Sequence, residues 1–141
     1  MSGNPTANIR PLSPQDLERV VAIDARIMGR SRRKFFEKRL QAALADNHGF
    51  VTLGLTGTSG ALQGYAIARI QNGEYGDEKR AAVLDVIGVD PDASHDGGGR
   101  ALLEAMTETL EKLKIDELRT QVDWQDQGLV RFFAAAGFQL A

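Results

Sequence analysis

The sequence predicts an α/β domain built on a mixed β-sheet. Two observations carry this prediction. Residues 50–56 and 62–70 have the pattern of two strands joined by a glycine-containing turn, which is typical of an antiparallel hairpin. Residues 82–89, 99–113 and 118–124 have the pattern of a strand, a helix and a strand. A right-handed crossover of this kind places its two strands parallel.

The remaining elements follow from periodicity and from helix boundary residues. A short extended segment at residues 8–10 precedes a helix over residues 13–29, whose apolar side chains recur at helical spacing until Gly29. A second helix is expected over residues 31–48, and a last one from Asp126 to Gly137. The strand at residues 82–89 is apolar on both faces except at Asp85, as expected of a central strand.

Composition limits the function. The 141 residues are 43% hydrophobic and 26% charged, with a net charge of −2, which fits one domain over residues 1–141 and argues against a nucleic-acid-binding surface. The absence of cysteine excludes disulfides and thiolate nucleophiles, and only two histidines argue against a metal site. No apolar run is long enough for a membrane helix, and the N-terminus lacks a secretory pattern. We therefore expect a cytoplasmic protein.

The most informative segment follows the predicted central strand. Asp90-Pro91 ends that strand, and Gly97, Gly98 and Gly99 lead directly into the next helix. Glycines let the backbone approach a ligand closely, and the amides at the start of a helix favour phosphate. The segment is not a Walker loop, and Leu102 makes it a poor dinucleotide fingerprint. From the glycines alone, a flexible loop before a helix is the other interpretation.

With its neighbours, this segment resembles the GNAT superfamily of acyl-CoA-dependent N-acetyltransferases. The family signature, Gln/Arg-x-x-Gly-x-Gly/Ala, follows a strand ending in Val-x-Pro and precedes a helix beginning Arg-x-Leu-Leu. Val89–Pro91, Ser94–Gly99 and Arg100–Leu103 follow that order. A second signature, Asn-x-x-Ala-x-x-Phe-Tyr-x-x-x-Gly-Phe, aligns with Asp126–Phe138.

The resemblance implies a fold and an activity. The fold is a mostly antiparallel sheet with a central parallel β-α-β crossover and helices on both faces. The activity is transfer of an acetyl group from acetyl-CoA to a primary amine, on a small molecule or a peptide, by direct attack in a ternary complex. The alternative is a non-catalytic acyl-CoA-binding or regulatory domain that kept the cofactor cleft.

The resemblance also implies where acetyl-CoA lies, in a gap between the strands at residues 82–89 and 118–124. The backbone of Ile87 and Val89 would pair with the pantetheine arm, and an amide near Ile87 or Gly88 would polarise the thioester carbonyl. Amides from His95 to Arg100 would hold the pyrophosphate. The implied cofactor-binding residues are Ile87, Gly88, Val89, Ser94, His95, Asp96, Gly97, Gly98, Gly99, Arg100, Asp126 and Phe133.

The sequence departs from the family at positions that matter for chemistry. Ser94 replaces the usual Gln or Arg, and Asp126 replaces the usual Asn. Phe133 stands where the family often has the tyrosine that protonates the departing thiolate, and a phenyl ring cannot donate a proton. Gln121 occupies a position where one subgroup, the ribosomal-protein alanine acetyltransferases, carries a catalytic glutamate.

Three residues are therefore candidates for acid–base chemistry. Asp85 is the candidate base, with its side chain expected on the same face as Val83 and Ile87. The alternative is a structural ion pair with Arg69. Asp123 is the second choice of base. Tyr75 is a weak candidate acid, and a solvated loop tyrosine is the other interpretation.

Two further expectations concern surfaces. Residues 26–39 hold seven basic side chains and one acidic one, and the family analogy places them near the acceptor. They would attract an acidic acceptor or form a solvated face. At the other end, only four residues follow Gly137, which would leave the last sheet edge exposed and favour a homodimer through that edge.

Overall fold

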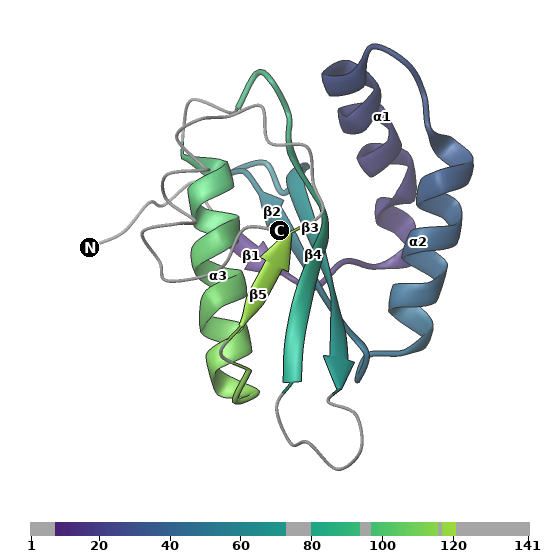
Figure 1. Cartoon of the computed structure of the whole chain (residues 1–141). Coiled ribbons are helices and arrows are strands. Elements are labelled where there is room, and N and C mark those ends of the chain that lie inside the picture. The colour runs from purple at the N-terminus through teal and green to yellow at the C-terminus, as the bar shows by residue number, and fades with distance from the viewer. Residues whose placement is uncertain (1–7, 73–79, 94–96, 116, 121–141) are drawn as a thin grey trace.

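The computed structural model describes residues 8–72, 80–93, 97–115 and 117–120 (Figure 1). Its elements, in chain order, are β1 (Asn8–Arg10), η1 (Pro14–Asp16), α1 (Leu17–Met28), α2 (Arg33–Ala45), β2 (Phe50–Thr56), β3 (Leu62–Asn72), β4 (Arg80–Val89), α3 (Gly98–Lys112) and β5 (Leu118–Thr120). None of the helices in these ranges is long and apolar enough to cross a bilayer.

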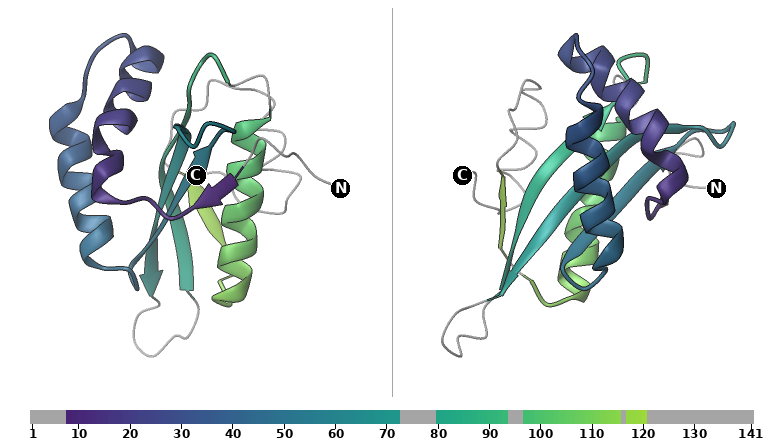
Figure 2. Two further views of the ribbon diagram at one scale, coloured as in Figure 1. Left: turned by 180° about the vertical axis from the view of Figure 1, so that it is seen from behind. Right: turned by 90° about the vertical axis from the view of Figure 1, so that its right-hand side faces the viewer.

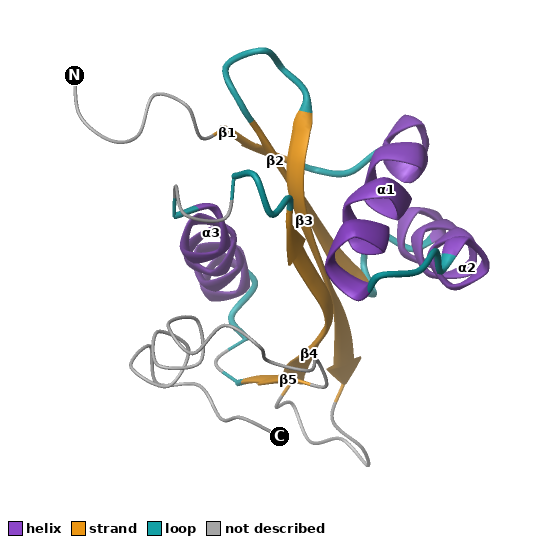
Figure 3. Cartoon of the chain, turned by 90° about the horizontal axis from the view of Figure 1, so that it is seen from above, coloured by secondary structure: helices purple, strands orange, loops and turns teal. Residues whose placement is uncertain are grey.

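The described strands form one sheet in the order β1-β2-β3-β4-β5. Every neighbouring pair is antiparallel except β4 and β5, which are parallel, as expected for the crossover through α3. Helices α1 and α2 cover one face and α3 covers the other (Figures 2 and 3). The predicted mixed, mostly antiparallel sheet with helices on both faces is confirmed.

A hydrophobic layer fills each side of the sheet. Under α3, buried side chains of the helix pack on those of the four strands β2 to β5, with Leu102, Leu103, Met106, Leu110, Leu53, Ala66, Leu84 and Leu118 among them. Under α1 and α2 the buried layer includes Val20, Ile23, Phe36, Leu40, Tyr65, Ile67 and Val86. Because both faces of β4 are covered, its near-continuous apolar sequence is explained.

β4 contains a β-bulge that the sequence does not reveal. Ile67 of β3 pairs with Val86, but the next residue, Ala68, pairs with Leu84, so Asp85 is an extra residue in the ladder. Asp85 and Val86 both face α1 and α2, whereas Ile87 packs in the α3 layer. The expectation that Asp85 and Ile87 share a face is wrong, because the bulge shifts the alternation of side chains by one residue.

An acidic residue fixes the start of α1 to the first strand. The Asp16 carboxylate accepts two hydrogen bonds from the Arg10 guanidinium, both at 2.9 Å, and one from the Ser13 amide at 2.8 Å. The hydrogen bond from Arg10 is the largest cause of a lowered pKa of Asp16, with the Ser13 amide acting in the same direction.

This lowered pKa predicts a stability change in acid. Because the folded-state pKa of Asp16 lies below its unfolded value, its stabilising effect is complete above about pH 4 and is lost as pH falls through the folded-state pKa. Since Arg10 is well exposed, we expect a contribution of only about 1 kcal/mol. Urea unfolding at pH 7 and pH 2 should show a smaller acid loss for Asp16→Asn than for the wild type; equal losses would contradict the prediction.

Candidate active site

Three expected parts of the site lie at one end of the molecule. β4 ends there, α3 begins there, and α1 reaches it with its C-terminal end (Figure 1). In the described residues, β5 pairs with β4 only along Ala82–Leu84, which leaves the rest of the β4 edge, from Asp85 to Val89, without a described neighbour on that side.

The direction of the β4 backbone groups follows from the ladder. The Asp90 amide donates a hydrogen bond to the Gln63 carbonyl at 2.7 Å, just beyond the pair of Gly64 with Val89. Since hydrogen-bonded and non-hydrogen-bonded pairs alternate in an antiparallel ladder, the amides and carbonyls of Ile87 and Val89 point away from β3. They point to the β5 side, whereas Gly88 bonds back to β3. Of the two amides proposed for the thioester carbonyl, that of Ile87 has the required direction.

The start of α3 has the backbone of an anion cradle. Gly97 precedes the helix with φ of 81° in the left-handed region, and the first helical hydrogen bond runs from Ala101 to the Gly97 carbonyl at 3.0 Å. The amides of Gly98 and Gly99 therefore have no acceptor within the helix. A Cβ on Gly98 would lie 2.6 Å from Leu55 Cδ2, so glycine is what lets this helix start pack on β2. These residues fit the phosphate-binding role that the resemblance implies.

Asp90 joins the end of β4 to α1. Its carboxylate is 6% exposed and forms ion pairs with Arg19 at 2.7 Å and Arg26 at 2.6 Å. The carboxylate also accepts a hydrogen bond from the Asp92 amide, and the Ala93 amide donates one to the backbone carbonyl of Asp90. This carboxylate thus orders the turn that leads into the glycine-rich segment.

Asp85 lies in an ion pair. Its side chain is 4% exposed, and its Oδ2 lies 3.3 Å from Arg39 Nη1 and 3.5 Å from Arg69 Nε. The pair with Arg69 is the structural alternative considered from the sequence, and Arg39 of α2 is a second partner that the sequence did not indicate. This geometry favours the structural role of Asp85 and leaves its role as a base a prediction.

The basic segment at residues 26–39 is largely paired. Arg26 binds Asp90 and Asp92, Arg32 binds Asp24, Arg33 binds Glu18, and Arg39 binds Asp85. Much of its positive charge is therefore balanced within the fold. Sequence reasoning expected either a solvated face or an attraction for an acidic acceptor, and it missed these partners because they lie on other elements.

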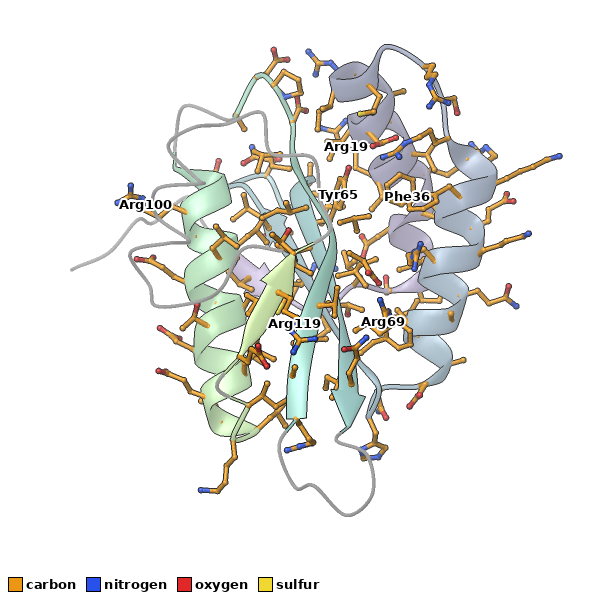
Figure 4. The ribbon with its side chains drawn as sticks, viewed as in Figure 1. Arg19, Phe36, Tyr65, Arg69, Arg100 and Arg119 are labelled. Atoms are coloured by element: carbon orange, nitrogen blue, oxygen red, sulfur yellow. The ribbon has the colours of Figure 1, made fainter. Side chains whose placement is uncertain are left out.

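Asp24 is a buried carboxylate that sequence reasoning also missed. It is 3% exposed and accepts two hydrogen bonds from Arg32, at 2.9 Å and 2.7 Å. The Arg32 guanidinium also lies over the ring of Phe35, 4.9 Å from its centroid. Tyr65 lies close to this ion pair, between the sheet and Phe36 (Figure 4).

Several candidate residues fall outside the described ranges. These are Tyr75, Ser94, His95, Asp96, Gln121, Asp123, Asp126 and Phe133, together with the C-terminal sheet edge expected to form a dimer. Among the residues that the structure does describe, no group of three or more Asp, Glu or His side chains could hold a metal ion.

Comparison with known proteins agrees with this fold. The sequence matches the model of the Acetyltransferase (GNAT) family over residues 17–138. Because this match covers most of the chain, the chain belongs to the GNAT family of acetyltransferases. No curated protein matches it.

Solved structures share the fold at low sequence identity. A transcriptional regulator from Bacillus halodurans C-125 superposes with a TM-score of 0.77 at 16% identity, covering 94% of this chain and 93% of that one. An acetyltransferase from Trypanosoma brucei has a TM-score of 0.73 at 18% identity, covering 94% and 92%. An aminoglycoside acetyltransferase from an uncultured soil metagenomic sample has a TM-score of 0.71 at 18% identity, covering 92% and 86%.

Proposed function

We propose that this protein is an N-acetyltransferase that transfers an acetyl group from acetyl-CoA to a primary amine by direct attack in a ternary complex. One observation carries the proposal: the outward-facing backbone of Ile87 and Val89 and the glycine start of α3 lie at the same end of the molecule. Acetyl-CoA supplies the activated acyl group, and both features suit its binding through backbone groups.

The chain's own residues divide the work of binding. The amides and carbonyls of Ile87 and Val89 pair with the pantetheine amides as an added strand would. The Ile87 amide donates to the thioester carbonyl oxygen, where negative charge develops as the amine attacks. The first amides of α3, beginning at Gly98, bind the pyrophosphate, where the helix dipole favours negative charge. Ser94, His95 and Asp96 extend this cradle, and Asp126 and Phe133 complete the cofactor site.

The acceptor is an amine of a small molecule or a peptide. The solved structures similar to this chain include those of two aminoglycoside acetyltransferases. Phe133 favours a second candidate function, a non-catalytic acyl-CoA-binding domain, because it removes the usual proton donor. Release of CoA from acetyl-CoA in the presence of a panel of amines, polyamines, aminoglycosides and peptide N-termini separates the two functions. Binding without turnover of any amine would favour the second.

Acetyl-CoA is expected to stabilise the folded protein against heat, because it binds the folded chain only. At a free concentration one hundred times its dissociation constant, the gain is about 2.7 kcal/mol, or several degrees for a domain of this size. Differential scanning calorimetry measures the shift. No shift at millimolar acetyl-CoA would contradict the proposed function.

A matched pair of variants locates the binding. Gly97→Asn should keep the fold, because asparagine tolerates the left-handed region and a Cβ at this position meets nothing within 4 Å. Its side chain enters the proposed phosphate cradle, so the thermal shift should fall. Gly60→Asn makes the same change at φ of 86°, also with open space, in the turn between β2 and β3, and should keep the full shift.

A further inference from the structure

The hydroxyl of Tyr65 is buried and has no hydrogen-bonding partner among the residues that the structure describes. Tyr65 lies on β3 with 1% of its surface exposed, and its ring packs edge-on against Phe36 with the centroids 5.7 Å apart. Its Oη makes no hydrogen bond to any residue in the described ranges. The nearby charged groups, Asp24 and Arg32, bond to each other. Because burying an unpaired hydroxyl costs free energy, this group calls for an explanation beyond packing.

The hydroxyl points across the neighbouring strand. Tyr65 and Gly88 are directly opposite in the β3–β4 ladder, and a Cβ on Gly88 would lie 2.4 Å from Tyr65 Oη. The ring therefore extends over β4 on the side of α1 and α2, and its hydroxyl lies on Gly88. Only glycine leaves room for it there. This places Oη beside the two residues, Ile87 and Val89, whose backbone groups face the β5 side.

We propose that Tyr65 Oη donates a hydrogen bond to the sulfur of the acetyl-CoA thioester and stabilises the thiolate as it leaves. This inference rests on the proposed N-acetyltransferase function. The amine nitrogen forms the new C–N bond, the C–S bond breaks, and its electron pair goes to sulfur. Water takes the proton that the amine loses and supplies the one that the departed thiolate gains. Tyr65 keeps its own proton throughout.

The surroundings of Tyr65 suit a neutral donor. Burial, and then the negative charge of Asp24, raise the pKa of the Tyr65 hydroxyl, so it stays protonated at neutral pH. A protonated hydroxyl can stabilise a developing anion without a proton transfer. A phenyl ring such as that of Phe133 cannot provide this hydrogen bond, whereas the Tyr65 hydroxyl on β3 can.

The test uses CoA itself and needs no acceptor. The ultraviolet absorbance of the thiolate gives the pKa of the CoA thiol bound to the wild type and to Tyr65→Phe. A hydrogen bond to the thiolate lowers this pKa, so we expect it to be about one to two units higher in Tyr65→Phe. Acetyl-CoA affinity should be unchanged, because that comes from backbone groups. An equal thiol pKa in the two proteins would overturn the inference.

Stability and turnover provide independent readouts. Tyr65→Phe removes one oxygen that has no described partner, so its Tm should equal or exceed that of the wild type. A structural role would lower the Tm instead and overturn the inference. With any amine found to be acetylated, kcat should fall about 10- to 100-fold while the KM for acetyl-CoA is kept.

Two further outcomes separate this inference from the proposed function. If the wild type binds neither CoA nor acetyl-CoA, the proposed function fails and this inference fails with it. If both bind and the thiol pKa changes in Tyr75→Phe but not in Tyr65→Phe, the proposed function stands and only the assignment to Tyr65 is overturned. Gly88→Ala, which displaces Oη, should raise the thiol pKa as Tyr65→Phe does.

Discussion

Asp90→Ala is expected to lower the free energy of unfolding by about 2–4 kcal/mol. The substitution removes a nearly buried carboxylate that binds Arg19, Arg26 and the Asp92 amide, and hydrogen bonds to charged groups are among the strongest in proteins. Both arginines are about two-fifths exposed and can be hydrated after the change, which keeps the loss below that of a fully buried pair. Thermal unfolding should show a Tm lower by roughly 5–15 °C.

Asp92→Ala is the matched control for this prediction. Asp92 is two residues away and also binds Arg26, at 3.1 Å, but its side chain is 79% exposed. Exposed pairs contribute about 0–1 kcal/mol, so this variant should unfold close to the wild type. If Asp90→Ala were no more destabilised than Asp92→Ala, the carboxylate of Asp90 would not hold α1 to the end of β4.

Asp85→Asn separates two roles for one carboxylate. As a member of the ion pair with Arg39 and Arg69, Asp85 should contribute mainly to stability, and we expect a loss of about 1–3 kcal/mol in the free energy of unfolding. Turnover per folded molecule should stay within about tenfold of the wild type, and acetyl-CoA should still bind. A general base would behave differently, with turnover lower by about 10²–10⁴.

A double-mutant cycle makes the structural role quantitative. Arg69→Gln removes one partner of Asp85, and urea unfolding of both single variants and the double variant gives their coupling free energy. Residues in direct contact commonly couple by about 0.5–3 kcal/mol. If the stability losses were additive and turnover fell strongly in Asp85→Asn but not in Arg69→Gln, Asp85 would instead act as the general base.

Elements with strong local patterns could be predicted from the sequence. The hairpin and the strand–helix–strand crossover follow from alternation, turn residues and helical spacing. The described residues contain both, as antiparallel β2 and β3 and as β4, α3 and β5. Helix boundaries differ slightly: α2 begins at Arg33 rather than Ser31. The glycine-led start of α3 could be located because Gly97, Gly98 and Gly99 are recognisable in the sequence; its role in binding phosphate stays a prediction.

The side-chain partners could not be predicted, because they depend on contacts between distant positions. Arg19 and Asp90 are 71 residues apart, and Arg39 and Asp85 are 46 apart. The position of the Tyr65 hydroxyl, which has no partner among the described residues, likewise depends on contacts between distant positions. In the sequence, Tyr65 is an ordinary strand residue, and only the register against Gly88 shows where its oxygen lies.

The bulge at Asp85 acts as a change of phase along β4. Before the bulge, the Ala82 amide donates a hydrogen bond to the Glu117 carbonyl on the β5 side, so the backbone amides and carbonyls of even-numbered residues point to that side. After the bulge, the backbone amides and carbonyls of the odd-numbered Ile87 and Val89 point to the β5 side. A regular ladder through the same residues would turn the Gly88 amide outward and the Ile87 amide inward, whereas loss of Asp85, the extra residue, would leave the pairs on both sides of it in register. The direction of the Ile87 and Val89 amides therefore depends on their register against β3, which the bulge maintains with the extra residue present, so the site should tolerate many substitutions at position 85 and also the loss of that residue.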